Sequence, residues 1–100
     1  MSKLDLEITS KAVSDIEQVT EFIARDNKLA ALKMAKLFYD VFEKLAVHPR
    51  LGKIKAEWTY LNILFYTVKH RYIVAYRIIN NSTIRILRVL SSYQDICSKF

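Results

Sequence analysis

The segment Arg71–Ile96, RYIVAYRIINNSTIRILRVLSSYQDI, does most to determine the expected fold. Apolar side chains, many of them β-branched or aromatic, flank an Asn80-Asn81-Ser82 turn, and asparagine tolerates the positive φ that a tight hairpin needs. The segment is therefore predicted to form two antiparallel strands, Tyr72–Ile79 and Thr83–Leu90. Four arginines interrupt the apolar run, and an arginine in a strand is costly when buried but useful when it meets an anionic partner.

Two helices are predicted ahead of Pro49, because apolar residues there recur at intervals of three and four. Thr9 or Ser10 is a suitable N-cap for the first helix, and Asn27 for the second. Since the break at Asp26-Asn27 is short, the helices are expected to form an antiparallel hairpin. The apolar stripes are Ala12, Ile16, Val19 and Ile23 in the first helix, and Ala31, Met34, Phe38, Val41 or Phe42, and Leu45 in the second.

A short strand through Leu4, Leu6 and Ile8 precedes the helices, and a strand at Leu61–Val68 follows Gly52. The order is β-α-α-β-β-β in one domain, residues 1–100. Strands segregated from helices favour an α+β fold, in which the two-helix hairpin packs on one face of a largely antiparallel sheet. The other face is expected to be open and free for function.

Composition and charge narrow the class of protein. The single cysteine, Cys97, excludes an intrachain disulfide, and no apolar run is long enough for a signal-peptide core or a membrane span, so a cytoplasmic location without membrane contact is expected. Residues 1–43 hold six Lys and Arg against eight Asp and Glu, whereas residues 44–100 hold ten against two. This one-sided basic charge favours a nucleic acid or an acidic protein as partner, with a merely solvated basic surface as the alternative.

Strand alternation predicts where the arginines point. The bulky apolar face of the middle strand is placed against the helices, which leaves Arg71 and Arg77 on the open face. The last strand has two possible registers. A two-residue turn pairs Arg77 with Ile84 and places Arg88 on the open face, whereas a three-residue turn pairs Arg77 with Arg85 and places Arg85 there.

Other candidate groups give weaker signals. His70 stands in a turn, His48 stands at a helix end, and Lys53-Ile54-Lys55 is interpreted as a solvated loop. Two histidines and one cysteine far apart in sequence give no metal-ligand spacing, and the chain has no glycine-rich phosphate loop. No metal and no cofactor are therefore expected.

Four segments in this order carry a family resemblance: SDIEQVTEFIARDNKLAALKMAKLFYDVFEKL, HPRLGK, RYIVAYRI and RILRVLSSYQDI. Together they resemble the RelE/ParE superfamily of bacterial toxins, the toxin halves of type II toxin–antitoxin modules, from about Leu4 to Ile96. The resemblance implies a cognate antitoxin as partner. The basic half of the chain favours an antitoxin whose C-terminal segment is acidic and is disordered when free.

The superfamily has two mechanisms, and the resemblance favours one of them. RelE-like members cut mRNA on the ribosome, whereas ParE-like members poison DNA gyrase and usually end in a pattern similar to R-V-L-H-x-x-R-D. This chain has Arg88-Val89-Leu90 and Asp95 but departs from the pattern at Ser91 and at Tyr93-Gln94. Where RelE-like chains place lysines it has Leu64 and Tyr66, and Ile73 stands where they place an arginine.

The preferred hypothesis is a ParE-like gyrase inhibitor. The target-binding residues are then Arg71, Arg77, Arg85, Arg88 and Tyr93. One alternative is a RelE-like ribosome-dependent mRNA interferase, whose partners are the ribosome and mRNA. In that case Tyr93 and His70 supply proton transfer and Arg71 supplies phosphate binding. A second alternative keeps the fold but not the toxicity, as a basic binding module.

Overall fold

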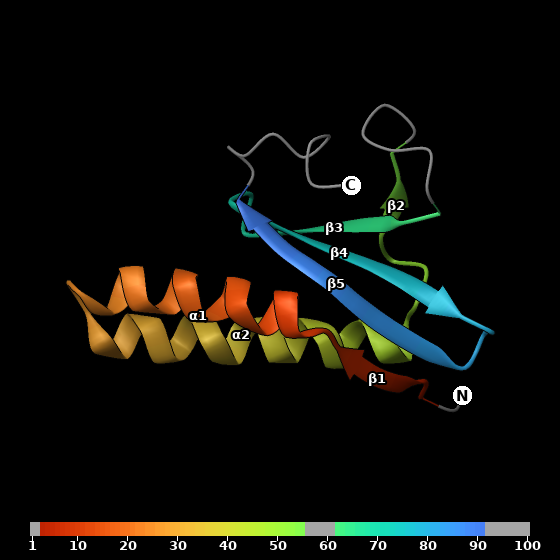
Figure 1. Cartoon of the computed structure of the whole chain (residues 1–100), viewed down its shortest axis with the longest axis horizontal. Helices are drawn as coiled ribbons and strands as arrows, with labels where there is room; N and C mark the ends of the chain where they lie inside the picture. The colour runs from red at the N-terminus through yellow and green to blue at the C-terminus, as the bar shows by residue number, and fades with distance from the viewer. Residues whose placement is uncertain (1–2, 56–61, 92–100) are drawn as a thin grey trace.

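The computed structural model describes residues 3–55 and 62–91. Its elements are β1 (Asp5–Ile8), α1 (Ser10–Ala24), α2 (Lys28–Val47), β2 (Lys53–Ile54), β3 (Leu64–Val68), β4 (Tyr72–Ile79) and β5 (Thr83–Ser91). The strands form one sheet in the order β1-β5-β4-β3-β2, and the α1–α2 hairpin lies against one of its faces (Figure 1). The predicted α+β fold is confirmed. Within the described residues, neither helix is long and apolar enough to cross a membrane.

The predicted helix caps are also confirmed. The Thr9 hydroxyl oxygen accepts a hydrogen bond from the Ala12 N–H at 3.2 Å. The same hydroxyl donates toward the carbonyl oxygens of Ile86 and Leu87, at 2.9 and 3.0 Å, so the cap also ties the start of α1 to β5. At α2, the Asn27 side chain accepts from the Ala30 N–H at 3.0 Å. Both caps satisfy N–H groups that a helix start would otherwise leave without partners.

The sheet differs from the sequence prediction in two details. β1 runs parallel to β5, with Leu6 beside Ile84, whereas the other pairs are antiparallel. The loop predicted at Lys53–Lys55 is wrong in part, because Lys53 and Ile54 pair with β3 as the short edge strand β2. A strand of two residues has no alternating run that a sequence could reveal, since it forms only where a neighbouring strand supplies its hydrogen bonds.

The three-residue turn between β4 and β5 is the correct register. Asn80 and Asn81 have φ values of 53° and 55°, and Arg77 lies opposite Arg85. A bulge between Ala75 and Tyr76 then shifts the register, so that Ala75 lies opposite Arg88. A bulge places two residues against one, which is why both Arg85 and Arg88 are paired with residues of the same β4 face.

The sheet is apolar on both faces. The main core, between sheet and helices, includes the fully buried Phe38, Phe42 and Tyr76. A second cluster lies on the far face, the side away from the helices, and comprises Ile63, Phe65, Ile73, Ala75 and Leu90 with the half-buried Leu87. The predicted open face is therefore wrong for the centre of the sheet. Four successive apolar residues, Ile73 to Tyr76, are the pattern of a strand buried on both sides.

The side chain of Tyr76 holds the connection between α2 and β2 in place through two hydrogen bonds. Its hydroxyl donates to the Pro49 carbonyl and accepts from the Gly52 N–H, both at 2.8 Å. A Cβ at Gly52 would lie only 2.6 Å from the Tyr76 oxygen, so this position needs glycine for close approach. Burial raises the pKa of the Tyr76 phenol, an effect that its hydrogen bond from Gly52 partly offsets.

Candidate functional site

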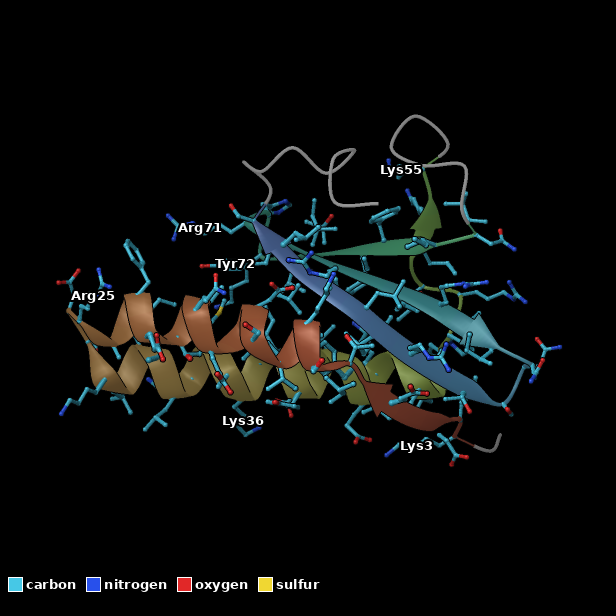
Figure 2. The ribbon with its side chains drawn as sticks, in the orientation of Figure 1. Lys3, Arg25, Lys36, Lys55, Arg71 and Tyr72 are labelled. Atoms are coloured by element: carbon cyan, nitrogen blue, oxygen red, sulfur yellow. The ribbon has the colours of Figure 1, made fainter. Side chains whose placement is uncertain are left out.

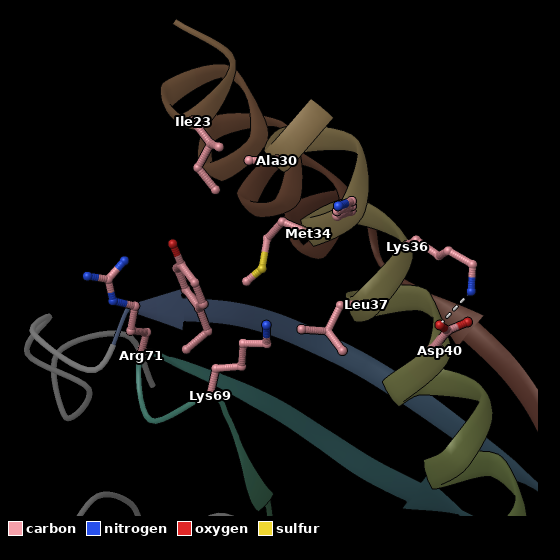
Figure 3. A pocket seen from close by; sticks show the side chains of 10 residues that line it. Ile23, Ala30, Met34, Lys36, Leu37, Asp40, Lys69 and Arg71 are labelled. Atoms are coloured by element: carbon pink, nitrogen blue, oxygen red, sulfur yellow. Dashed lines mark hydrogen bonds and ion pairs between the residues drawn. The ribbon is translucent and has the colours of Figure 1, made fainter. Parts of the chain in front are cut away.

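The helical hairpin extends beyond the sheet (Figure 1). Residues of this overhang and of the β3–β4 turn line a groove, which we call the groove beneath the overhang. The groove has a volume of about 580 Å³ and is open to solvent. Its apolar residues are Ile23, Ala30, Met34, Leu37 and Tyr72, and its charged residues are Lys33, Lys36, Asp40, Lys69 and Arg71. Met34 and Leu37 project from α2 into the groove, with Lys69 on the opposite wall (Figure 3).

Tyr72 is the apolar centre of this region. Its ring packs edge-on against Phe38, with centroids 5.4 Å apart and planes at 79°. It also lines a second hollow, bordered by Val19, Phe22 and Val89, so that two concave surfaces meet at this one side chain. Phe22 is 70% exposed. A large exposed aromatic beside a hollow is a common feature of protein interaction sites.

The rim of the groove is strongly basic. Lys36 pairs with Asp40 at 2.8 Å, but both side chains are well exposed, so this ion pair contributes only about 0.3–0.5 kcal/mol. Within the described residues, Lys33, Lys69 and Arg71 have no carboxylate partner. An apolar floor with an excess of cations at its rim suits an amphipathic, acidic segment.

The turn between β3 and β4 presents two of these cations. Lys69 and His70 have φ values of 52° and 59°, in the left-handed region that residues other than glycine and asparagine rarely adopt. The Arg71 N–H donates to the Val68 carbonyl and closes the turn. His70 therefore lies in a turn, as predicted, with Lys69 and Arg71 on either side.

The predicted arginine set does not form one patch. Arg71 and Tyr72 lie at the end of the sheet nearest the overhang, whereas Lys55 lies toward the opposite end (Figure 2). Arg77 is six residues along β4 from Arg71, which is about 20 Å in an extended strand. Arg77 is exposed, and Arg85 opposite it pairs with Glu7 at 3.1 Å. This second surface, the cationic end of the far face, comprises Arg77, Arg85 and the exposed Lys53.

Arg88 has a structural role that the sequence did not predict. Its Nε and Nη2 donate to the Asp15 carboxylate at 2.8 and 2.9 Å, and the Val89 N–H donates to the same carboxylate at 2.9 Å. The two side chains are only 21% and 11% exposed. The hydrogen bonds that Arg88 donates to Asp15 raise the pKa of its guanidinium above the ordinary value. Asp15 joins α1 to β5 across 73 residues of sequence, so the carboxylate that pairs with Arg88 comes from the acidic half of the chain.

The groups considered for RNA cleavage are only partly described. Tyr93 lies outside the described residues. Leu64 and Tyr66 lie opposite Tyr76 and Val74, on the strand face that packs toward the helices, and the Tyr66 hydroxyl accepts a hydrogen bond from Lys44 at 3.3 Å. Among residues 3–55 and 62–91, no three His, Cys, Asp or Glu side chains form a group that could hold a metal ion.

The family model for the ParE toxin of the type II toxin–antitoxin system parDE matches residues 6–96. No curated protein sequence matches. A chain of the chromosomal ParDE toxin–antitoxin system from P. aeruginosa has a TM-score of 0.71 at 17% identity, and the match covers 89% of this chain and 96% of that one.

A chain of the RelBE2 toxin–antitoxin complex from Mycobacterium tuberculosis has a TM-score of 0.64 at 22% identity, covering 90% of this chain and 99% of that one. At such identities the structural likeness supports the fold alone. The family match, by contrast, covers nearly the whole chain. The chain therefore belongs to the ParE toxin family, within the RelE/ParE superfamily of type II toxin–antitoxin toxins.

Proposed function

We propose that this toxin inhibits DNA gyrase and is neutralised by an acidic antitoxin. The observation that best supports gyrase over mRNA is the chemistry of the far face. Its described centre is filled by apolar side chains such as Ile73 and Ala75. The cations at one end of this face are Arg77, Arg85 and Lys53, and Glu7 is paired with Arg85. Guanidinium and ammonium groups bind anions but do not exchange protons readily near neutral pH, as a nuclease requires.

The target surface in this proposal is the cationic end of the far face. Arg77 has no ion pair within the described residues and is exposed, while Arg85 retains 38% side-chain exposure beside Glu7. Two arginines directly opposite one another repel, so a stable fold gains little from placing them there. Contact with an anionic partner would relieve that repulsion. The target-binding role predicted for Arg71 stays a prediction.

Ribosome-dependent mRNA cleavage is the second candidate, because one observation favours it. His70 lies between Lys69 and Arg71 in the β3–β4 turn, so on this hypothesis an imidazole stands between two cations that can bind phosphate. Tyr93 would supply the second proton-transfer group. A toxin fold without toxicity, as a basic binding module, would bind the antitoxin and inhibit neither target.

Expression in a growing bacterium should distinguish these functions. On the gyrase proposal we expect DNA-damage signalling, filamentous cells and inhibition of supercoiling by purified gyrase, while mRNA in translating ribosomes stays uncut. Arg77→Ala and Arg85→Ala should weaken the inhibition more than Tyr93→Phe or His70→Gln. General acid–base groups typically contribute about 10²–10⁴-fold each, so an mRNA interferase should lose most activity in the last two variants.

The opposite pattern would replace the gyrase proposal by the interferase. That pattern is prompt codon-specific cleavage of mRNA, with gyrase unaffected and with cleavage lost in Tyr93→Phe. If neither gyrase nor mRNA is affected by protein that is folded and binds an antitoxin, the non-toxic binding module is the correct function.

The groove beneath the overhang is the proposed antitoxin site. Its apolar floor should bind the apolar side of an amphipathic acidic segment, and Lys33, Lys69 and Arg71 should meet that segment's carboxylates. Each of Lys69→Glu and Arg71→Glu should weaken antitoxin binding by about tenfold at low salt, because charge reversal replaces attraction by repulsion. Lys11→Glu, an exposed reversal on α1 outside the groove, is the matched control and should change the affinity little.

Titration calorimetry at two ionic strengths measures the charged and the apolar contributions to antitoxin binding. Rising salt should weaken binding to the unmodified chain and should narrow its difference from the Glu variants, since exposed charges are screened. Met34→Asp should weaken binding at both salt concentrations, because it removes an apolar contact. An affinity that is independent of salt and equal in Lys69→Glu and Lys11→Glu would contradict the placement of the antitoxin in the groove.

A further inference from the structure

A separate concave surface lies between α1 and α2. It has a volume of about 420 Å³ and shares no residue with the groove beneath the overhang. Thr20, Glu21 and Ala24 contribute to it from α1, and Lys28, Ala31, Leu32 and Ala35 contribute from α2. We call this surface the hairpin face.

The hairpin face combines a protruding and a receding apolar part. Leu32 is 70% exposed, whereas Ala31 at the base of the hollow is 6% exposed. A leucine exposed to this degree leaves most of its apolar area in water, and covering it is favourable. A face that carries both an exposed leucine and a hollow can fit a copy of itself when a two-fold axis brings each Leu32 to the hollow of the other chain.

The charges of the hairpin face are self-complementary too. Glu21 and Lys28 flank the hollow, and within the described residues neither forms an ion pair. A two-fold axis through the hollow brings Glu21 of one chain toward Lys28 of the other, twice. The whole chain carries a net charge of +6, so most of its surfaces repel a second copy. Residues 1–43, which contain α1 and most of α2, hold more acidic than basic groups.

From this geometry we propose that two copies of the chain associate through the hairpin face. The contact is isologous, with Leu32 at its centre and two Glu21–Lys28 pairs at its rim. Because it involves few residues, the contact is smaller than the roughly 800 Å² per partner of a standard stable interface. The dimer is therefore weak and depends on concentration. It leaves the groove and the far face uncovered, so it is compatible with binding of an antitoxin or a target.

Sedimentation equilibrium of the purified chain, over roughly 1–300 µM, tests the proposal. The unmodified chain should shift from monomer to dimer within this range. Leu32→Asp should raise the dissociation constant at least about tenfold, as expected for the central residue of a contact. Leu29→Asp is the matched control, because Leu29 is a 61% exposed leucine of the same helix that does not line the hollow. It should leave the dimer unchanged.

Charge exchange tests the two-fold arrangement. Glu21→Lys alone should weaken the dimer several-fold, and the double variant Glu21→Lys, Lys28→Glu should restore it, because each pair is rebuilt with reversed polarity. Circular dichroism must show that every variant is folded. A chain that stays monomeric throughout, or a dimer equally sensitive to Leu29→Asp and Leu32→Asp, overturns the proposal. Loss of antitoxin binding in Leu32→Asp without any change in self-association would assign the hairpin face to the antitoxin instead.

Discussion

Tyr76→Asp should abolish folding of this toxin. Tyr76 is fully buried between the sheet and the helices, so a carboxylate placed there would lose its contact with water. The substitution removes the ring, and loss of a large buried aromatic by itself lowers the free energy of unfolding by about 3–5 kcal/mol. It also either buries a charged carboxylate or forces that carboxyl group to take up a proton. Since domains are typically stable by only about 5–15 kcal/mol, little or no folded protein should remain. Circular dichroism and size-exclusion chromatography would measure this.

Two milder variants separate the contribution of the Tyr76 hydroxyl from the effect of burying a charge. Tyr76→Phe keeps the ring but leaves the Gly52 N–H and the Pro49 carbonyl without their partner, which should cost about 1–3 kcal/mol in urea unfolding. Arg77→Ala, the adjacent residue on the exposed side, should stay within about 0.5 kcal/mol of the unmodified chain. If Arg77→Ala unfolds the domain and Tyr76→Asp does not, the assignment of the two strand faces is wrong.

The buried phenol also predicts a dependence on alkaline pH. Because the folded state raises the pKa of Tyr76 above its ordinary value of 10, the unfolded chain releases this proton first as the pH rises. The contribution of the Tyr76 phenol to the stability of the fold is therefore fully present below pH 10, and it is lost as the pH rises through the higher pKa of the folded state. In Tyr76→Phe this part of the alkaline loss should disappear.

Local features of the fold were predictable from the sequence because short-range chemistry determines them. The caps at Thr9 and Asn27 depend on one polar side chain before an apolar stripe, and the β4–β5 hairpin depends on asparagines that accept a positive φ. Even the correct register was one of only two that the turn allowed. The burial of Ile73 on the far face agrees with the unbroken apolar run around it, since a strand with one open face would alternate apolar and polar residues.

The candidate site was less predictable because it depends on tertiary placement. Alternation places Arg71 and Arg77 on one face, but it says nothing of their separation along β4 or of the overhang that makes Arg71 part of a groove lined by both helices. Arg88 shows the same limit. Its partner Asp15 lies in another element, and the bulge at Ala75 that alters its position leaves no signal in a single sequence.

Asp15→Ala is the second substitution with a large expected effect. It removes an acceptor of three hydrogen bonds at once, leaving the Arg88 guanidinium and the Val89 N–H without partners in a largely covered position. Breaking a buried ion pair from one side costs about 3–5 kcal/mol, because the remaining charge stays desolvated. The ion pair of Arg85, which lies on β5 like Arg88, supplies a matched control. Glu7→Ala breaks the exposed pair with Arg85 and should cost no more than about 1 kcal/mol.

Urea unfolding of Asp15→Ala, Arg88→Ala and the double variant would measure the coupling directly. If the pair stabilises the fold as described, the double variant should lose less stability than the two single losses added together. Equal costs for Asp15→Ala and Glu7→Ala would show that burial of the Arg88 pair contributes nothing. The same measurement decides how a loss of toxicity in Arg88→Ala is interpreted. A less toxic variant with unchanged stability would restore Arg88 to the target surface, whereas toxicity that falls in proportion to the folded fraction assigns it to the joint between α1 and β5.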